Sequence, residues 1–176
     1  MKFFSDIRLL ILGLWLGAAV YFIGAAQNAF AVLESREMAG AVVNRNLALL
    51  NYFGIAVAVI LLAASIIGVA KVSKFWLWVE RFLLLLLGAA CAVGQFVISV
   101  WMASIKAQIG RPIEEAAADD PLRIQFNMLH QYSQWVLLAG IFAALIAFFI
   151  VSNRKFNRTV AAEKPDVYDF SKEFKI

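Results

Sequence analysis

The chain has 176 residues, of which 63% are hydrophobic and 16% charged, and its formal net charge is +4. Average soluble domains are about half apolar and about a quarter charged, and a soluble domain of this size could not bury so much apolar surface in one core. The high apolar and low charged fractions argue against a nucleic-acid-binding domain and a disordered chain. A disulfide scaffold is excluded because Cys91 is the only cysteine. The composition indicates an integral membrane protein.

A membrane-spanning helix needs about 20 consecutive, mostly apolar residues. Four stretches meet this requirement, at residues 9–33, 47–70, 75–105 and 129–151. None contains proline, and none shows the short alternating pattern of transmembrane β-strands. We expect an all-α, polytopic integral membrane protein with four transmembrane helices in an antiparallel bundle. Residues 1–153 would form the transmembrane domain, and residues 154–176 a cytoplasmic C-terminal tail.

The loops carry signals for where helices start and stop. Gly110 can end the third spanning helix as a C-cap, and Asp120 followed by Pro121 is typical of a helix start. We therefore expect a short helix in the third loop and a second helix that runs from Pro121 into the fourth span.

Positive charge predicts the orientation of the chain. Of the 16 Lys and Arg residues, 11 lie in the N-terminal segment, the second loop and the C-terminal tail, which would share one side. Basic residues favour the cytoplasmic side. We expect both termini in the cytoplasm and the protein in a bacterial inner (plasma) membrane.

Polar side chains gather in the half of each span that would lie outside. This distribution predicts an outward-facing polar vestibule above an apolar plug, or alternatively hydrogen bonds that join the helices to one another. The candidate ligand-binding residues are Asn28, Asn51, Gln95, Ser99, His130 and Gln134. On the first span, a stripe of small and polar residues shares one helical face, which we expect to point into the bundle: Gly13, Gly17, Tyr21, Gly24 and Asn28.

His130 is the only histidine. It is a weak candidate for ligating the metal of a haem or a chlorophyll-type pigment, and the alternative is an interfacial hydrogen-bonding residue. No residue set resembles a catalytic triad, a zinc site or a phosphate loop. We expect no enzymatic activity, no catalytic residue, no metal site and no cofactor.

Two further features are candidates for function. Glu80 is either a functional carboxylate inside the membrane or a headgroup-level side chain near Arg81, Lys74 or water. The tail carries Tyr168, Phe170 and Phe174, which are candidate partner-binding residues because exposed aromatic side chains favour docking on a protein or a membrane surface.

Three segments resemble a known family. They are residues 12–17 (LGLWLG), residues 38–40 (MAG) and residues 126–133 (FNMLHQYS), together with Ala29 and Phe30. These segments resemble the transmembrane protein 205-like family, also described as a domain of unknown function, over roughly residues 8–150. The resemblance implies a four-helix membrane fold in which His130 is the family's histidine, and it implies no established biochemical activity.

The sequence thus favours a non-enzymatic accessory or scaffold subunit of a larger membrane complex. Its expected partners are membrane lipids and other membrane-protein subunits, without nucleic acid. The alternative is a small transport or resistance protein that uses the outer vestibule. A weaker alternative is a pigment-binding protein with His130 as the ligand.

Overall fold

The computed structural model describes residues 2–67 and 73–153. It consists of α1 (Lys2–Val32), α2 (Arg36–Ile67), α3 (Lys74–Ala92), the π-helical segment η2 (Val93–Ile98), α4 (Ser99–Ile109), the single 3-10 turn η3 (Ile113–Glu115) and α5 (Pro121–Ser152). Because α3, η2 and α4 follow one another without a break, they form one span. Four helices are long and apolar enough to cross a membrane, and the described residues contain no strand. The predicted all-α, four-helix membrane architecture is confirmed.

The loop signals that were predicted are present. Gly110 ends α4 in the left-handed conformation, with φ of 65°, which glycine adopts without a steric penalty. Asp120 caps α5, because its carboxylate accepts a hydrogen bond of 2.8 Å from the backbone N–H of Leu122. Pro121 occupies the first turn of α5, and η3 is the expected short helix of the third loop.

The helices are longer than their apolar stretches. α2 begins at Arg36 and α5 at Pro121, in both cases well before the apolar residues that predicted the spans. The four spans contain 30 to 36 residues, which corresponds to about 45–54 Å at a rise of 1.5 Å per residue. A bilayer has a hydrocarbon core of only about 30 Å. Part of each helix must therefore extend beyond this core or be tilted within it.

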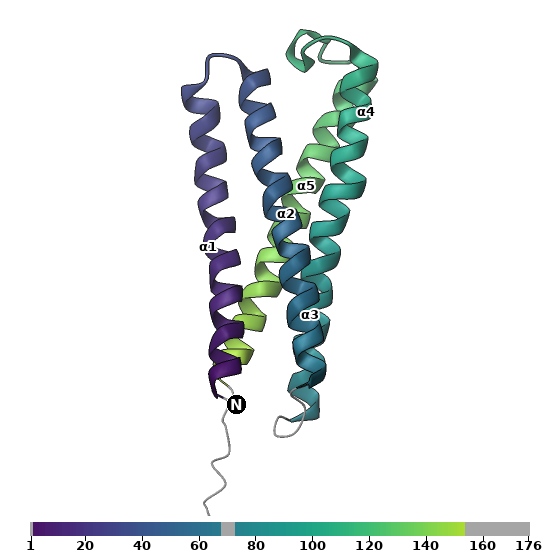
Figure 1. Cartoon of the computed structure of the whole chain (residues 1–176). Helices are drawn as coiled ribbons and strands as arrows, with labels where there is room; N and C mark the ends of the chain where they lie inside the picture. Colours follow the sequence, from purple (N-terminus) through teal and green to yellow (C-terminus); the bar gives the residue numbers. More distant parts are fainter. Residues whose placement is uncertain (1, 68–72, 154–176) are drawn as a thin grey trace, which may run out of the picture.

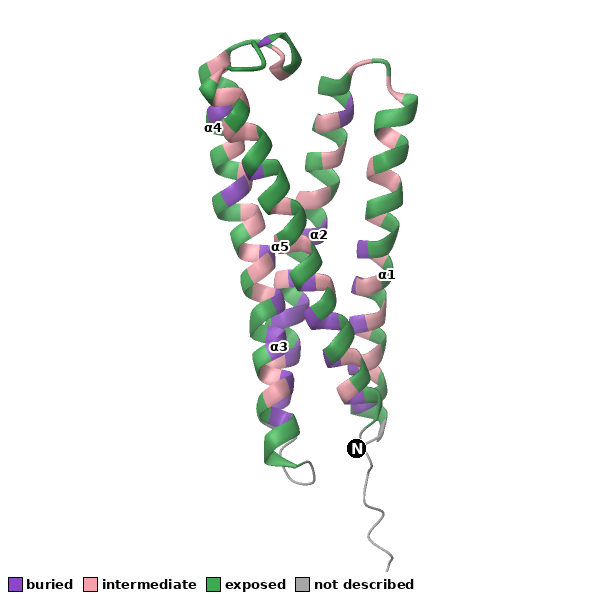
Figure 2. Cartoon of the chain, turned by 180° about the vertical axis from the view of Figure 1, so that it is seen from behind, coloured by how far each residue is buried: buried purple, intermediate pink, exposed green. Residues whose placement is uncertain are grey.

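The bundle is packed differently at its two ends (Figure 1). We call the end where α1 starts and α5 finishes the terminal end, and the end that carries the loop between α4 and α5 the loop end. At the terminal end, α1 and α3 both pack against α2 and α5. Towards the loop end, the α1–α2 pair and the α4–α5 pair diverge, as Figures 1 and 2 both show.

The main hydrophobic core lies in the part where all four spans meet (Figure 2). Its buried residues come from each span: Leu12, Trp15, Ala19, Leu50, Val57, Leu61, Leu83, Leu84, Leu87, Cys91, Ala143, Ala144 and Ala147. A smaller cluster joins the α4–α5 pair through Ile98, Ile105 and Leu129. The two halves of the molecule therefore have separate cores, and only the first core holds both helix pairs together.

Trp15 is the centre of the main core. Its side chain is fully buried, and its indole Nε1–H donates a hydrogen bond of 3.2 Å to the backbone carbonyl of Leu50. The indole lies directly beside Gly54, where an added Cβ atom would be 2.7 Å from Trp15 Nε1 and in still closer contact with Cys91 Sγ. Gly54 is thus the position that lets α1, α2 and α3 approach one another this closely.

The orientation of α1 corrects one prediction. Beyond Gly13, where an added Cβ atom would be 3.7 Å from Phe148, the stripe that we expected to point inward faces away from the buried residues Leu12, Trp15 and Ala19. These residues lie on the opposite side of a helix with 3.6 residues per turn. Tyr21 is 77% exposed, and a Cβ atom added at Gly17 or Gly24 would meet nothing within 4 Å. The large indole, and not the small residues, determines which face of α1 enters the core.

Candidate functional site

The six predicted vestibule residues occupy different environments. Asn51 is buried, with 4% of its surface exposed, while Gln95 and Ser99 are half-buried and Asn28, His130 and Gln134 are exposed. His130 and Gln134 lie one turn apart on α5, with 3.2 Å between their Nε2 atoms. Asn28 lies on the outward face of α1, among the residues around Tyr21 and Gly24. The structure therefore does not collect the six residues into one site.

Asn51 lies deepest of the six residues. It lines a small cavity where the two helix pairs begin to diverge, together with Trp15, Cys91, Gly94 and Ser133. The backbone of η2 passes close to it, since a Cβ atom added at Gly94 would be 3.3 Å from Asn51 Nδ2. Asn51 is therefore the deepest of the six residues between the two helix pairs, and we call it the polar floor of this region.

The π-helical segment places polar groups next to this floor. Gly94 accepts a hydrogen bond of 2.9 Å from the Ser99 hydroxyl, five residues along the chain, in addition to the backbone N–H of Ser99. Gln95 approaches Tyr52 on α2, with 3.5 Å between Gln95 Nε2 and the Tyr52 hydroxyl oxygen. π-Helical turns are rare in proteins, and those that do occur are often found at functional sites. We therefore include η2 in the candidate site.

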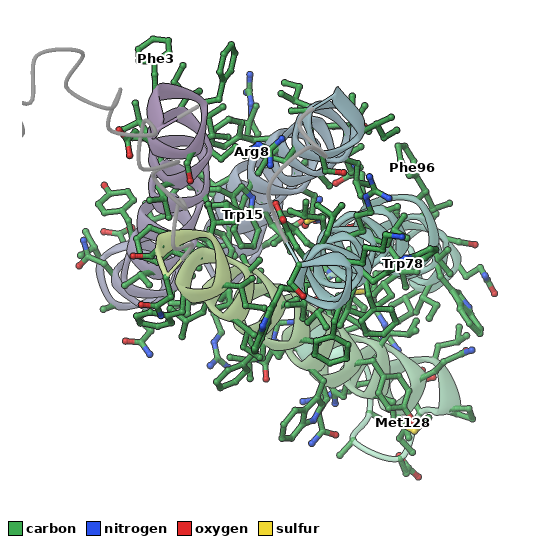
Figure 3. The ribbon with its side chains drawn as sticks, turned by 90° about the horizontal axis from the view of Figure 1, so that it is seen from below. Phe3, Arg8, Trp15, Trp78, Phe96 and Met128 are labelled. Carbon is green, nitrogen blue, oxygen red and sulfur yellow. The ribbon has the colours of Figure 1, made fainter. Side chains whose placement is uncertain are left out.

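A second polar cluster lies near the terminal end. The sequence singled out Glu80 as a candidate but did not reveal its partner Arg8. Arg8 on α1 and Glu80 on α3 form an ion pair, with 3.6 Å between Nη1 and Oε1, and only 1% of the surface of Glu80 is exposed. Figure 3 shows Arg8 pointing into the space between the helices, as Trp15 does, while Phe3 and Phe96 point outward. Glu80 is thus paired with Arg8 inside the bundle.

The same cluster supplies partners for the last turns of α2. Arg8 donates to the backbone carbonyl of Ala64. Arg81 donates to the Ser65 carbonyl through Nη2 and to the Ser65 hydroxyl through Nε, both at 3.0 Å. The last carbonyls of a helix lack partners within the helix and carry partial negative charge, so two guanidinium groups satisfy and stabilise them. The cluster joins α1, α2 and α3 at one level.

Apolar side chains fill the space between the two polar regions. Fully buried residues from all four spans lie between Asn51 and the Arg8–Glu80 pair, among them Trp15, Leu84 and Ala144. Among the described residues, this layer presents no continuous polar path from one end of the bundle to the other. The bundle is thus closed by apolar packing towards the terminal end, and it has an open polar region at the loop end.

Some predicted sites are not brought together by the structure or are not described by it. In the described ranges, no group of three His, Cys, Asp or Glu side chains is placed to hold a metal ion. The predicted partner-binding residues Tyr168, Phe170 and Phe174 lie outside the described residues. The pigment alternative for His130 stays a prediction, and Gln134 is the neighbour that the structure gives it.

Comparison with known proteins identifies the family of this chain but not its activity. A family model described as a domain of unknown function (DUF4149) matches residues 10–111. The match includes Trp15, Asn51, Gly54, Glu80 and Gln95, and it ends before α5 begins. Searches of curated proteins and of solved structures returned no match. Because the family model covers more than half of the chain, the chain belongs to the DUF4149 family, a family defined by a domain of unknown function.

Proposed function

We propose that this chain is a non-enzymatic accessory or scaffold subunit of a larger membrane complex. The observation that carries the proposal is the outward face of α1. This face carries small residues, has open space at Gly17 and Gly24, and forms a shallow groove of about 490 Å³ beside Tyr21 and Asn28. In lipid, small residues let two helix backbones approach closely. The face is therefore suited to receive a transmembrane helix of another subunit.

The interior of the bundle supports the same proposal. The layer around Trp15 is packed with apolar side chains, and the Arg8–Glu80 pair fixes α1 against α3 below it. A rigid anchor with an uncovered helix face fits a protein that positions other subunits better than one that moves a solute. We further propose a bacterial inner membrane, with both termini in the cytoplasm, and a relationship to the transmembrane protein 205-like family.

The α1 face can be tested by co-purification after mild detergent extraction. Leucine at both Gly17 and Gly24 would cover the small-residue face, and Gly24 also lines the groove. Because a Cβ atom added at either position meets nothing within 4 Å, we expect the variant to fold and to lose its partner subunit. Ala56→Leu with Ala63→Leu is the matched control, because both alanines are exposed on α2 with the same spacing of seven residues. The measurement is the stoichiometry of the co-purifying subunit. A free monomer in the wild-type preparation would contradict the proposal.

The tail provides a separate test of the same function. We expect deletion of residues 165–176 to remove Tyr168, Phe170 and Phe174 and to weaken association with the partner complex. The measurement is again the amount of partner recovered per chain, compared with a chain in which only these three aromatic residues are replaced by serine. Unchanged recovery in both variants would exclude the tail, but not α1, as the docking element.

A small transport or resistance protein is the second candidate function, favoured by Asn51 and Gln95 at the floor of the polar region. If this candidate is correct, Gln95→Leu and His130→Leu should each change cellular accumulation of a solute while the purified variants keep the melting temperature of the wild-type protein. An unchanged accumulation profile across a broad solute panel would exclude it. An absorption spectrum of the purified protein tests the pigment alternative, which requires a visible band.

A further inference from the structure

The side-chain amide of Asn51 has an unmet hydrogen-bonding requirement. Its Nδ2 atom is buried and has no hydrogen-bond partner among the described residues, and the residue as a whole is 4% exposed. It lies between the apolar main core and the polar groups of η2. A buried amide N–H without a partner is unfavourable in such surroundings, so the fold needs a compensating acceptor at this position.

The cavity beside Asn51 has the size and the lining for one such acceptor. Its volume is about 10 Å³, close to the smallest volume that holds a single water molecule. Ser133 also lines the cavity. Its hydroxyl donates to the His130 carbonyl at 2.7 Å, so its oxygen lone pairs remain able to accept a hydrogen bond. A water molecule needs two to four polar partners, and it could accept from Asn51 and donate to Ser133.

We propose that the cavity between Asn51, Ser133 and η2 binds one water molecule, which accepts a hydrogen bond from Asn51 Nδ2. The cavity is too small for an organic ligand. Since its lining comes from α1, α2, α3, η2 and α5, the water would connect the two helix pairs where they begin to diverge. It would also be the deepest hydrated point of the loop-end half, because Trp15 closes the cavity on the side of the main core.

The test is a double-variant cycle on the full-length protein. Gly140 lines the cavity, and a Cβ atom there would be 3.5 Å from Ala90 Cβ and 3.7 Å from Leu87 Cδ1, which is ordinary van der Waals contact. Gly140→Ala therefore reduces the cavity without a clash. Asn51→Leu removes the amide and keeps a similar volume. The cycle compares the effect of Gly140→Ala on the melting temperature in the two backgrounds.

If the water is present, Gly140→Ala displaces it and leaves the Asn51 amide without an acceptor. We then expect its effect on the melting temperature to be less favourable by about 2–4 °C in the wild-type background than in the Asn51→Leu background. An equal shift in both backgrounds would overturn the proposal. If Asn51→Leu does not fold, a crystal structure of the wild-type protein decides: an ordered water within hydrogen-bond distance of Nδ2 supports the site, and a dry cavity refutes it.

Discussion

Glu80→Ala is expected to lower the free energy of unfolding by about 3–5 kcal/mol, the range observed when one partner of a buried ion pair is removed. The reason is the burial of Arg8, whose side chain is 10% exposed and whose guanidinium would then lack its counter-charge. The Ala64 carbonyl would remain as an acceptor for Arg8, but it does not neutralise the charge. The measurement is equilibrium unfolding by denaturant in mixed micelles.

The matched control removes both charges at once. Arg8→Met together with Glu80→Leu replaces the ion pair by apolar side chains of similar size, and such replacements are often neutral in buried positions. We expect the double variant to recover most of the stability that Glu80→Ala loses. A loss below about 1 kcal/mol for Glu80→Ala would place the pair in the class of exposed salt bridges and would contradict its burial inside the bundle.

Gly54→Val is expected to be the most damaging substitution at a glycine. Its side chain would overlap Cys91 Sγ and the Trp15 indole, which lies 2.7 Å from the position of an added Cβ atom. Because both neighbours belong to the buried core, neither can move into solvent, and α1 and α3 must separate from α2. Overpacking of this kind typically costs about 1–3 kcal/mol and sometimes more. Thermal unfolding of the purified variant measures the loss.

Two comparisons make this prediction specific. Gly24→Val places the same side chain on the same kind of helix in open space, so we expect little change in melting temperature. Cys91→Ala removes one of the two overlapping neighbours, and we expect it to reduce the cost of Gly54→Val when the two changes are combined. Equal destabilisation by Gly54→Val and Gly24→Val would mean that close approach at Gly54 is not required.

Much of the fold could be predicted because its signals are local. Each span is a long apolar stretch, and the caps at Gly110 and Asp120 depend on residues that are neighbours in sequence. The start of α2 at Arg36 was less predictable, since its polar first turns do not contribute to an apolar window. The helix includes these turns because polar side chains outside the hydrocarbon core are compatible with helical backbone.

The parts that could not be predicted depend on contacts between distant residues. Arg8 and Glu80 come from different spans, and each looks like an interfacial charge in its own segment. They meet only because α1 and α3 both pack against α2 and α5. Likewise, the stripe of small residues around Gly17 has the pattern of an inward face. The burial of one large side chain, Trp15, reverses that orientation. Asn28 is separated from the other candidate ligand-binding residues for the same reason, because it lies on the face of α1 that the core does not use.

Photo-crosslinking in intact cells tests directly whether another protein docks on the outward face of α1. A photoreactive phenylalanine analogue at Tyr21 samples this face, and the same analogue at Phe82, which is 64% exposed on α3, samples a different surface. We predict one discrete heavier adduct from position 21 that is absent from position 82 and is lost when Gly17 and Gly24 are both leucine. No adduct at position 21, or the same adducts at both positions, would contradict this prediction.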